Sequence, residues 1–272
     1  TTAANNTAVG SSALLANTDG HSNTAVGAEA GDANTTGDYN VSLGMQALTS
    51  DTTGSRSTAI GAAALFTQNF TGGTESYNTA VGFYAGVSIS TGIQNTVVGG
   101  LALDANTTAS NNTALGYATL SANTTAANNT AVGHKALIAN TTGANLVALG
   151  GSALVANTTG NSNVGIGYLA LDANTTASNN IAIGQHAVGT NTTGASNVGI
   201  GHEALYLNTT AANNTAVGFQ ALRANTTGTD NVAVGANAAD ALTTGSGNIA
   251  LGRNALSVAT ITTYNTAIGR EA

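Results

Sequence analysis

The sequence predicts an all-β protein, a parallel β-solenoid (β-roll) of about sixteen coils with a 17-residue repeat. Two observations lead to this fold. Written in lines of seventeen from Thr1, the chain repeats one pattern sixteen times, beginning with TTAANNTAVGSSALLAN. Each line also contains a short β-branched run that ends in glycine, which is typical of a strand followed by a turn. Residues 1–272 are therefore interpreted as a single repeat array.

The predicted strand occupies positions 7 to 9 of the repeat. Residues 130–133 (TAVG) are representative: position 7 is Thr, Val or Ile, position 8 is mostly small, position 9 is Val, Ile or Leu, and position 10 is always glycine. Glycine there supplies a backbone conformation or a close approach that a Cβ atom would prevent. A second short strand is predicted at positions 13 and 14, where alanine and leucine recur, as in Ala221 and Leu222.

The rest of each line is predicted to form turns. The run ANTTG or ANTTA recurs seven times at the ends of the lines, and its Asn, Thr and Gly residues favour turns. Glycine and β-branched runs in every line argue against helix. Two strands and two turns per line give a flattened roll whose coils stack about 4.8 Å apart. Two irregularities are expected, an insertion at 62–76 and a shortened stretch at 86–92.

The strand pattern predicts that one chain does not fold alone. No line has a charged residue at positions 7, 8 or 9, which is typical of a strand buried on both sides. One side faces the interior of the roll, and the other needs a partner. Small residues at position 8 favour close approach of neighbouring chains around a shared axis, and identical stacked coils favour cyclic symmetry. We therefore expect an elongated cyclic assembly of identical chains, and this pattern leaves both two and three chains open.

Composition argues against several classes of function. The net charge of -7 and the wide separation of the five Lys and Arg residues argue against binding to nucleic acid. The chain has no cysteine and no long apolar run, so neither a disulfide framework nor membrane insertion of this segment is expected. His186, His202 and Glu203 fall on consecutive lines, but no ligand spacing recurs, and we expect no metal. Neither a cofactor motif nor a catalytic triad is recognised, which predicts a non-enzymatic protein.

Candidate binding residues lie at the positions that vary, which are 11, 12 and 15. Aromatic side chains there provide contact area for a host-surface protein or a glycan, and loops inserted into a rigid scaffold often carry binding. The alternative is that these residues have no binding role and only cover turns or face solvent. The predicted binding residues are Phe83, Tyr84, Tyr117, His134, Lys135, Tyr168, His202 and Phe219, together with Phe66 and Phe70 of the insertion.

The repeat also resembles known fibre proteins. The runs NTAVG, NVSLG, NIAIG, NVGIG and NIALG resemble the SVAIG-type motif of the heads of YadA-like trimeric autotransporter adhesins, and NTAVGxxALxANTTG is similar to repeats of phage and bacterial tail-fibre-like proteins. The resemblance covers nearly the whole chain and implies a left-handed roll that assembles along its length as an elongated homotrimer at the bacterial cell surface. The 17-residue unit is longer than the coil of the adhesin heads, and their neck and stalk have no match here.

These observations predict an extracellular adhesive fibre segment that projects from a cell or virion. A phage tail fibre or a purely structural surface filament is the alternative, since both use the same scaffold. An ice-binding solenoid is a third hypothesis, because threonine recurs at positions 1 and 2. The pattern already runs at both ends of the chain, so we expect an excerpt of a longer protein.

Overall fold

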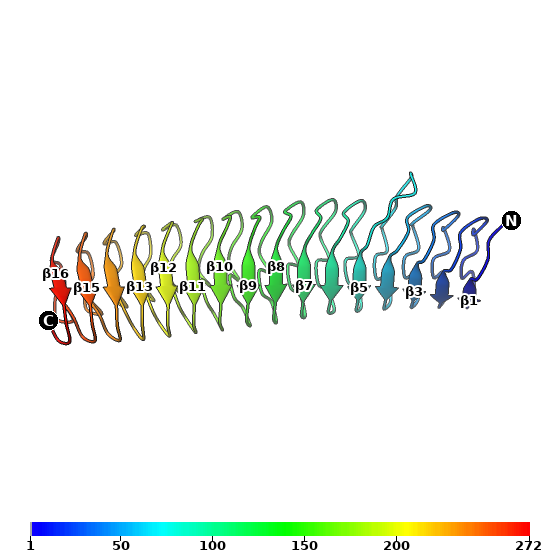
Figure 1. Ribbon diagram of the computed structural model, residues 1–272. Coiled ribbons are helices and arrows are strands. Elements are labelled where there is room, and N and C mark those ends of the chain that lie inside the picture. The colour runs from blue at the N-terminus through cyan, green and yellow to red at the C-terminus, as the bar shows by residue number, and fades with distance from the viewer. Residues whose placement is uncertain (1) are drawn as a thin grey trace. The chain divides into compact units, whose positions relative to one another are not determined.

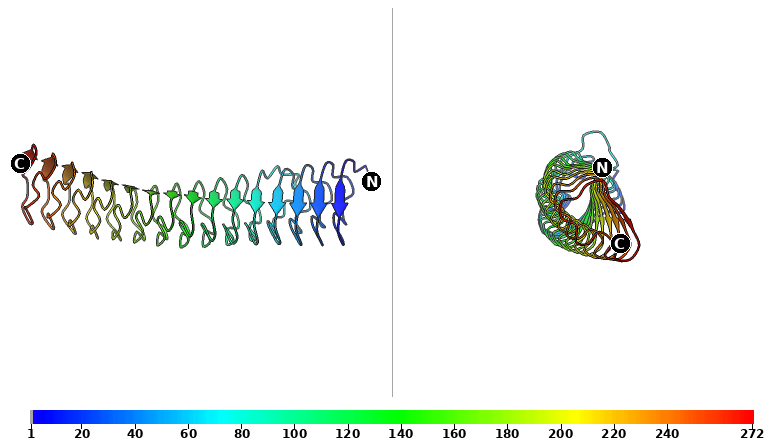
Figure 2. Two further views of the ribbon diagram at one scale, coloured as in Figure 1. Left: turned by 90° about the horizontal axis from the view of Figure 1, so that it is seen from below. Right: turned by 90° about the vertical axis from the view of Figure 1, so that its left-hand side faces the viewer.

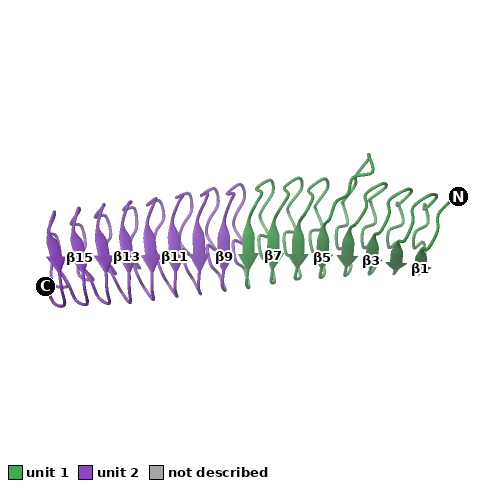
Figure 3. Ribbon diagram, in the orientation of Figure 1, with its two compact units in different colours: residues 1–135 green, residues 136–272 purple. Residues whose placement is uncertain are grey.

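A computed structural model describes residues 2–272, and these contain sixteen three-residue β-strands and no helix. Figure 1 shows the strands as arrows, one in each coil. The chain divides into two compact units, residues 1–135 and 136–272, which Figure 3 colours green and purple. Both units are built from the same repeat, and the prediction of an all-β parallel solenoid is confirmed.

Unit 1 contains eight strands, one at positions 7 to 9 of each repeat. Each pairs in parallel with its neighbours along the chain, in register. The strands are β1 (Thr7–Val9), β2 (Thr24–Val26), β3 (Val41–Leu43), β4 (Thr58–Ile60), β5 (Thr79–Val81), β6 (Thr96–Val98), β7 (Thr113–Leu115) and β8 (Thr130–Val132).

Unit 2 repeats this arrangement with eight further strands, and within each unit successive coils lie one above the next (Figure 2). The strands are β9 (Val147–Leu149), β10 (Val164–Ile166), β11 (Ile181–Ile183), β12 (Val198–Ile200), β13 (Thr215–Val217), β14 (Val232–Val234), β15 (Ile249–Leu251) and β16 (Thr266–Ile268).

The strand register locates the irregular coil. Paired residues are seventeen apart within both units except between β4 and β5, where Thr58 pairs with Thr79 and the coil is four residues longer. The predicted insertion at 62–76 is therefore present, and its additional residues lie between Gln68 and Asn78. Thr79 pairs with Thr96, seventeen residues later. Residues 86–92 thus have the regular length, and the prediction of a shortened stretch is wrong.

Glycine at position 10 is required by two features of the backbone. Gly99 has a backbone φ of 138°, a conformation that residues with a Cβ atom rarely adopt. A Cβ atom at Gly99 would also lie 2.3 Å from the carbonyl oxygen of Gly116 in the next coil. The end of the strand therefore stacks backbone directly against backbone, which explains why no other residue occupies this position.

The predicted second strand at positions 13 and 14 is wrong. These residues form turns, because the backbone alternates into the left-handed region at positions 12 and 14, as at Gln220 (φ 54°) and Leu222 (φ 50°). The alternation sends successive N–H groups to opposite neighbours. Gln220 N–H donates to the His202 carbonyl of the preceding coil, and Leu222 N–H donates to the Ala238 carbonyl of the following one. Coils remain hydrogen-bonded here without a β-strand.

The interior of each coil combines small apolar side chains with asparagine. Positions 8, 13 and 14 are buried, as at Ala216, Ala221 and Leu222. Positions 6 and 17 are also buried and are mostly asparagine, which stacks in two ladders along the coils. Buried polar groups need partners, and the ladders supply them from coil to coil. The sequence analysis assigned the position-17 asparagines to turns and did not predict either ladder.

Candidate interaction surfaces

The outward face of the strands is uncharged, carries an aliphatic side chain at position 9 of every coil and is only partly covered. Side chains at positions 7 and 9 point outward, and the side chain at position 8 points into the coil, as the alternation of a strand requires. Val98 and Ile183 at position 9 remain 38% and 36% exposed, whereas Val97 and Ala182 are fully buried. We call positions 7 and 9 of β1–β16 the strand face.

This geometry corrects one expectation. The small residues at position 8 were expected at an interface between chains, but they pack inside the coil against the leucine at position 14. A Cβ atom at Gly165, for example, would lie 3.2 Å from the Leu154 side chain. Position 8 is small because the interior is narrow, and the surface left for a neighbouring chain is the strand face.

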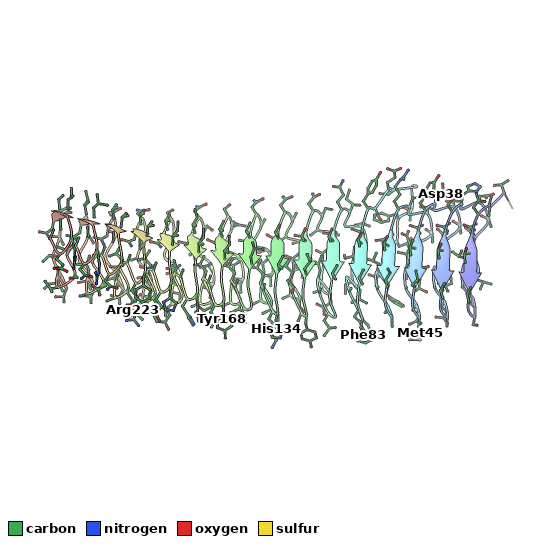
Figure 4. The ribbon with its side chains drawn as sticks, turned by 60° about the horizontal axis from the view of Figure 1, so that its bottom comes forward. Asp38, Met45, Phe83, His134, Tyr168 and Arg223 are labelled. Carbon is green, nitrogen blue, oxygen red and sulfur yellow. The ribbon has the colours of Figure 1, made fainter. Side chains whose placement is uncertain are left out.

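A second surface follows the strand in each coil and carries the predicted binding residues at positions 11, 12 and 15. Phe83, His134, Tyr168 and Arg223 project from this edge in Figure 4, and Asp38 projects from the opposite one. We call it the aromatic edge. The predicted residues with exposed side chains are Phe83, Tyr84, Tyr117, His134, Lys135, Tyr168, His202 and Phe219.

Within unit 1 the aromatic edge brings together residues from neighbouring coils. Tyr117 and His134 stack with ring centroids 5.9 Å apart and an interplanar angle of 13°. Phe83 and Tyr84 meet edge to face at 4.2 Å. These contacts preorder the planar groups while leaving their outer faces open to solvent, so they form an exposed aromatic surface rather than part of the core.

Unit 2 has a larger cluster on its aromatic edge. His186 lies between two tyrosines, with its ring centroid 6.0 Å from Tyr168 and 5.7 Å from Tyr206. Gly189 makes room for this packing, because a Cβ atom there would lie 2.9 Å from the Tyr206 ring. One coil further, His202 stacks on Phe219 at 5.4 Å. Sequence reasoning placed these residues on one edge but did not predict that they touch.

Charged groups complete the unit 2 cluster. Arg223 lies 5.6 Å from the centre of the Tyr206 ring and donates to Glu203 at 2.7 Å. Hydrogen bonds from Arg223 and then from Gln220 lower the pKa of the Glu203 carboxyl. Residues 2–272 contain no group of three or more His, Asp or Glu side chains arranged to hold a metal ion. The Glu203 carboxylate is therefore paired with the Arg223 guanidinium.

The insertion places its two predicted phenylalanines differently. Phe66 is half-buried, whereas Phe70 is only 5% exposed. Phe70 N–H donates to Asp51 Oδ1 at 3.1 Å, and its carbonyl accepts from the Thr53 hydroxyl at 2.7 Å, which draws the residue inward. The expectation that Phe70 contacts a partner at the surface is therefore wrong, and Phe70 anchors the loop instead.

The edge opposite the aromatic edge carries a cluster that the sequence analysis missed. Tyr39, Arg56 and Tyr77 occupy position 5 of three consecutive coils, and the Arg56 guanidinium lies 5.1 Å and 5.9 Å from the two ring centres. Arg56 also pairs with Glu75 at 2.9 Å, and Tyr77 donates its hydroxyl to Glu75. The signal in the sequence is that position 5 carries Tyr, Arg and Tyr in three successive repeats, which places their side chains next to one another.

The threonines at positions 1 and 2 do not form a double outward ladder. The hydroxyl at position 1 donates to the next coil, as from Thr175 to the Thr192 carbonyl at 3.2 Å, whereas Thr176 at position 2 is exposed. In such coils one threonine at most presents a free hydroxyl to solvent. A threonine ladder of the kind considered for ice binding would therefore consist of position 2 alone, and that alternative stays a prediction.

Comparisons with known proteins provide no relative for this chain: no family model, curated protein or solved structure matches it. The described residues contain no helix with the length and apolar character needed to cross a membrane. A functional proposal must therefore be based on the strand face, the aromatic edge and the insertion themselves.

Proposed function

We propose that the chain is a segment of an extracellular attachment fibre, in which three copies pack through their strand faces and present their aromatic edges to a target surface. The observation that carries the proposal is the strand face. It has an aliphatic residue at position 9 of every coil and threonine, valine or isoleucine at position 7, contains no charged residue and runs in register through each unit.

Packing of copies is favoured by the free energy of covering this face. Burying a half-exposed valine or isoleucine contributes about 0.5–1 kcal/mol, from the usual value per unit of apolar area. Every coil presents one such aliphatic side chain at position 9, and seven coils present a second one at position 7, so small contributions recur along the array. Uncovered contiguous apolar surface of this kind is unusual in monomeric proteins and commonly marks an interface.

A closed ring of copies fits the repeat better than a contact with an unrelated partner. In parallel copies, each coil meets the same coil of its neighbours at the same height, and cyclic symmetry then covers every strand face at once. Three copies are proposed because of the resemblance to trimeric adhesin heads. The aromatic edge lies past the position-10 glycine, away from the strand face, and stays available.

The aromatic edge supports an adhesive role. Planar groups such as Tyr168, His202 and Phe219 offer contact area at low entropic cost to a host-surface protein or a glycan. A repeated array presents many copies of a weak contact, and the resulting avidity suits attachment at a bacterial cell surface. A phage tail fibre would use the same scaffold on a virion.

The mass in solution tests the assembly. Light scattering coupled to size exclusion is expected to give about three times the chain mass of 26.3 kDa. Replacing Ile166, Ile183 and Ile200 together by glutamate introduces charge into three adjacent coils of the strand face and is expected to dissociate the trimer. The matched control replaces Thr159, Thr176 and Thr193 of the same coils at position 2. A folded, soluble monomer of the native sequence at micromolar concentration would overturn the proposal.

Attachment needs a separate measurement. Binding of the fluorescently labelled protein to immobilised extracellular-matrix proteins and mucin is expected to saturate. Combined replacement of Tyr168 and Phe219 by alanine is expected to weaken it at least fivefold without changing the mass. Equal binding by the variant would remove the aromatic edge from the proposal, and binding to none of these surfaces would favour the purely structural filament.

A further inference from the structure

The insertion creates a feature that the regular repeat cannot form. The long coil between β4 and β5 projects a loop, seen in cyan above the other coils in Figure 1. Beside this loop lies an open hollow of about 530 Å³. Small-molecule sites in proteins usually have volumes of about 300–1,000 Å³. The lining includes Asn69, Phe70, Thr71, Thr74, Thr91 and Ile93.

The lining combines an apolar base with hydroxyl and amide groups and contains no charged side chain. Phe70 is nearly buried and Ile93 is half-buried, so both present limited apolar area. Thr71 and Thr91 are exposed, and Thr74 is half-buried. Hydroxyl groups both donate and accept hydrogen bonds, so they can pair with the hydroxyls of a ligand in either sense.

The hollow is held in place before any ligand arrives. Asn69 N–H donates to the Ser90 carbonyl at 2.9 Å, which fixes the start of the loop to the next coil. Gly73 N–H donates to the Thr53 hydroxyl at 3.1 Å, which fixes the loop on the preceding coil. A preordered site loses less conformational entropy on binding than a mobile loop would.

We propose that this hollow binds one or two residues of a neutral saccharide. A neutral sugar matches the lining because its ring hydroxyls pair with threonine and asparagine, and a C–H face meets the half-buried Ile93. An anionic or cationic ligand would find no opposite charge in the lining. The hollow lies within one chain, separate from the strand face and the aromatic edge, so the inference does not depend on the proposed assembly.

The test uses the full 272-residue chain and a defined panel of sugars. Saturation-transfer NMR is run with the methyl glycosides of glucose, galactose, mannose and N-acetylglucosamine and with lactose and maltose. Sialic acid and glucosamine serve as charged comparisons. At least one neutral sugar is expected to give a saturable signal, and the charged sugars are expected to bind at least tenfold more weakly than that sugar.

Variants assign the binding to the hollow. Thr91→Trp places an indole in the hollow and is expected to weaken sugar binding at least tenfold. Thr176→Trp makes the same change at position 2 of an unaltered coil and is expected to leave binding within twofold. Thr91→Ala removes the hydroxyl and the methyl group of an exposed side chain and is expected to weaken binding even if Thr91→Trp does not fold.

Three results would overturn the proposal: no saturable signal from any neutral sugar, preference for a charged sugar, or unchanged affinity in a folded Thr91 variant. None of them affects the mass of the assembly or the contribution of Tyr168 and Phe219 to attachment. Failure of the saccharide site and failure of the fibre proposal are therefore separable.

Discussion

Asn197 and Asn208 share one acceptor, the carbonyl oxygen of Ala211. Asn197 Nδ2 donates to it at 2.8 Å from position 6 of the coil, and Asn208 Nδ2 donates at 3.0 Å from position 17. The two asparagine ladders therefore meet at position 3, where a turn enters the interior. A carbonyl has two lone pairs, and here both are used. This convergence closes the coil without a large apolar core, and asparagine occupies positions 6 and 17 of most coils.

The ladder predicts that a single interior asparagine has a large effect on stability. In the Asn197→Ala variant, the N–H of Asn214 loses its acceptor Asn197 Oδ1, which lies 3.0 Å away, and the Ala211 carbonyl loses one donor. Leaving buried groups unpaired costs roughly 1–3 kcal/mol each. We expect a loss of about 2–4 kcal/mol in the free energy of unfolding, measured by urea denaturation. Gln185→Ala, which removes an exposed side-chain amide, should change it by less than about 0.5 kcal/mol.

Gly99 and Gly100 are adjacent, and substituting each by alanine tests why position 10, at the end of the strand, must be glycine. Gly99→Ala forces a Cβ atom against backbone at φ 138°, whereas a Cβ atom at Gly100 would meet nothing closer than 3.8 Å. We expect Gly99→Ala to cost more than about 3 kcal/mol or to prevent folding. Gly100→Ala should be neutral or stabilising by up to about 1 kcal/mol. Thermal unfolding of both variants measures the difference, and equal melting temperatures would contradict the proposed role of position 10.

Asp51 predicts a pH-dependent contribution to stability. It replaces the usual asparagine at position 17, it is 1% exposed, and burial raises the pKa of its carboxyl despite hydrogen bonds from Gln68 and Phe70. The folded state therefore holds the proton more tightly than the unfolded state does. Stability from this group is greatest below the ordinary carboxyl pKa and declines as pH rises through the raised value.

The substitution Asp51→Asn removes this decline. Relative to the native protein, the variant is expected to gain stability progressively as the pH rises from about 4, the ordinary carboxyl pKa, through the raised pKa of Asp51. Urea denaturation at several pH values measures the difference. Asp19→Asn is a control of opposite sign, because hydrogen bonds from Thr2 lower the pKa of Asp19. A pH-independent difference between Asp51→Asn and the native protein would contradict the assignment.

Burial also predicts which Asn-X-Thr sequences can be modified. Asn34 and Asn174 at position 17 are 3% and 0% exposed, and the Asn174 amide donates to Asn157 Oδ1 and to the Ala177 carbonyl. Asn111 and Asn213 at position 5 also begin such sequences and are exposed. We expect an N-glycosyltransferase added to the folded protein to modify the exposed asparagines at position 5 and not the buried ones at position 17. Peptide mass spectrometry measures this, and modification of Asn174 in folded protein would contradict the ladder.

Local sequence determined the repeat, the strand at positions 7 to 9 and the turn after it. A β-branched run ended by Gly99 or Gly116 specifies this part of the coil through backbone preferences that depend on few neighbours. The aromatic edge was also predictable, because residues seventeen apart in an uninterrupted array stack on one another. Tyr117 and His134 are such a pair.

Only the tertiary structure decided which side of each strand faces inward. Alternation shows that Thr96 and Val98 share a face, but the direction in which the chain turns after Gly99 decides whether that face is covered. The same closure converts positions 13 and 14 into turns and brings asparagines from distant positions of a coil to one carbonyl. It also draws Phe70 inward, because an acceptor on Asp51 lies in the preceding coil. These outcomes depend on contacts between coils, which the sequence of one repeat does not contain.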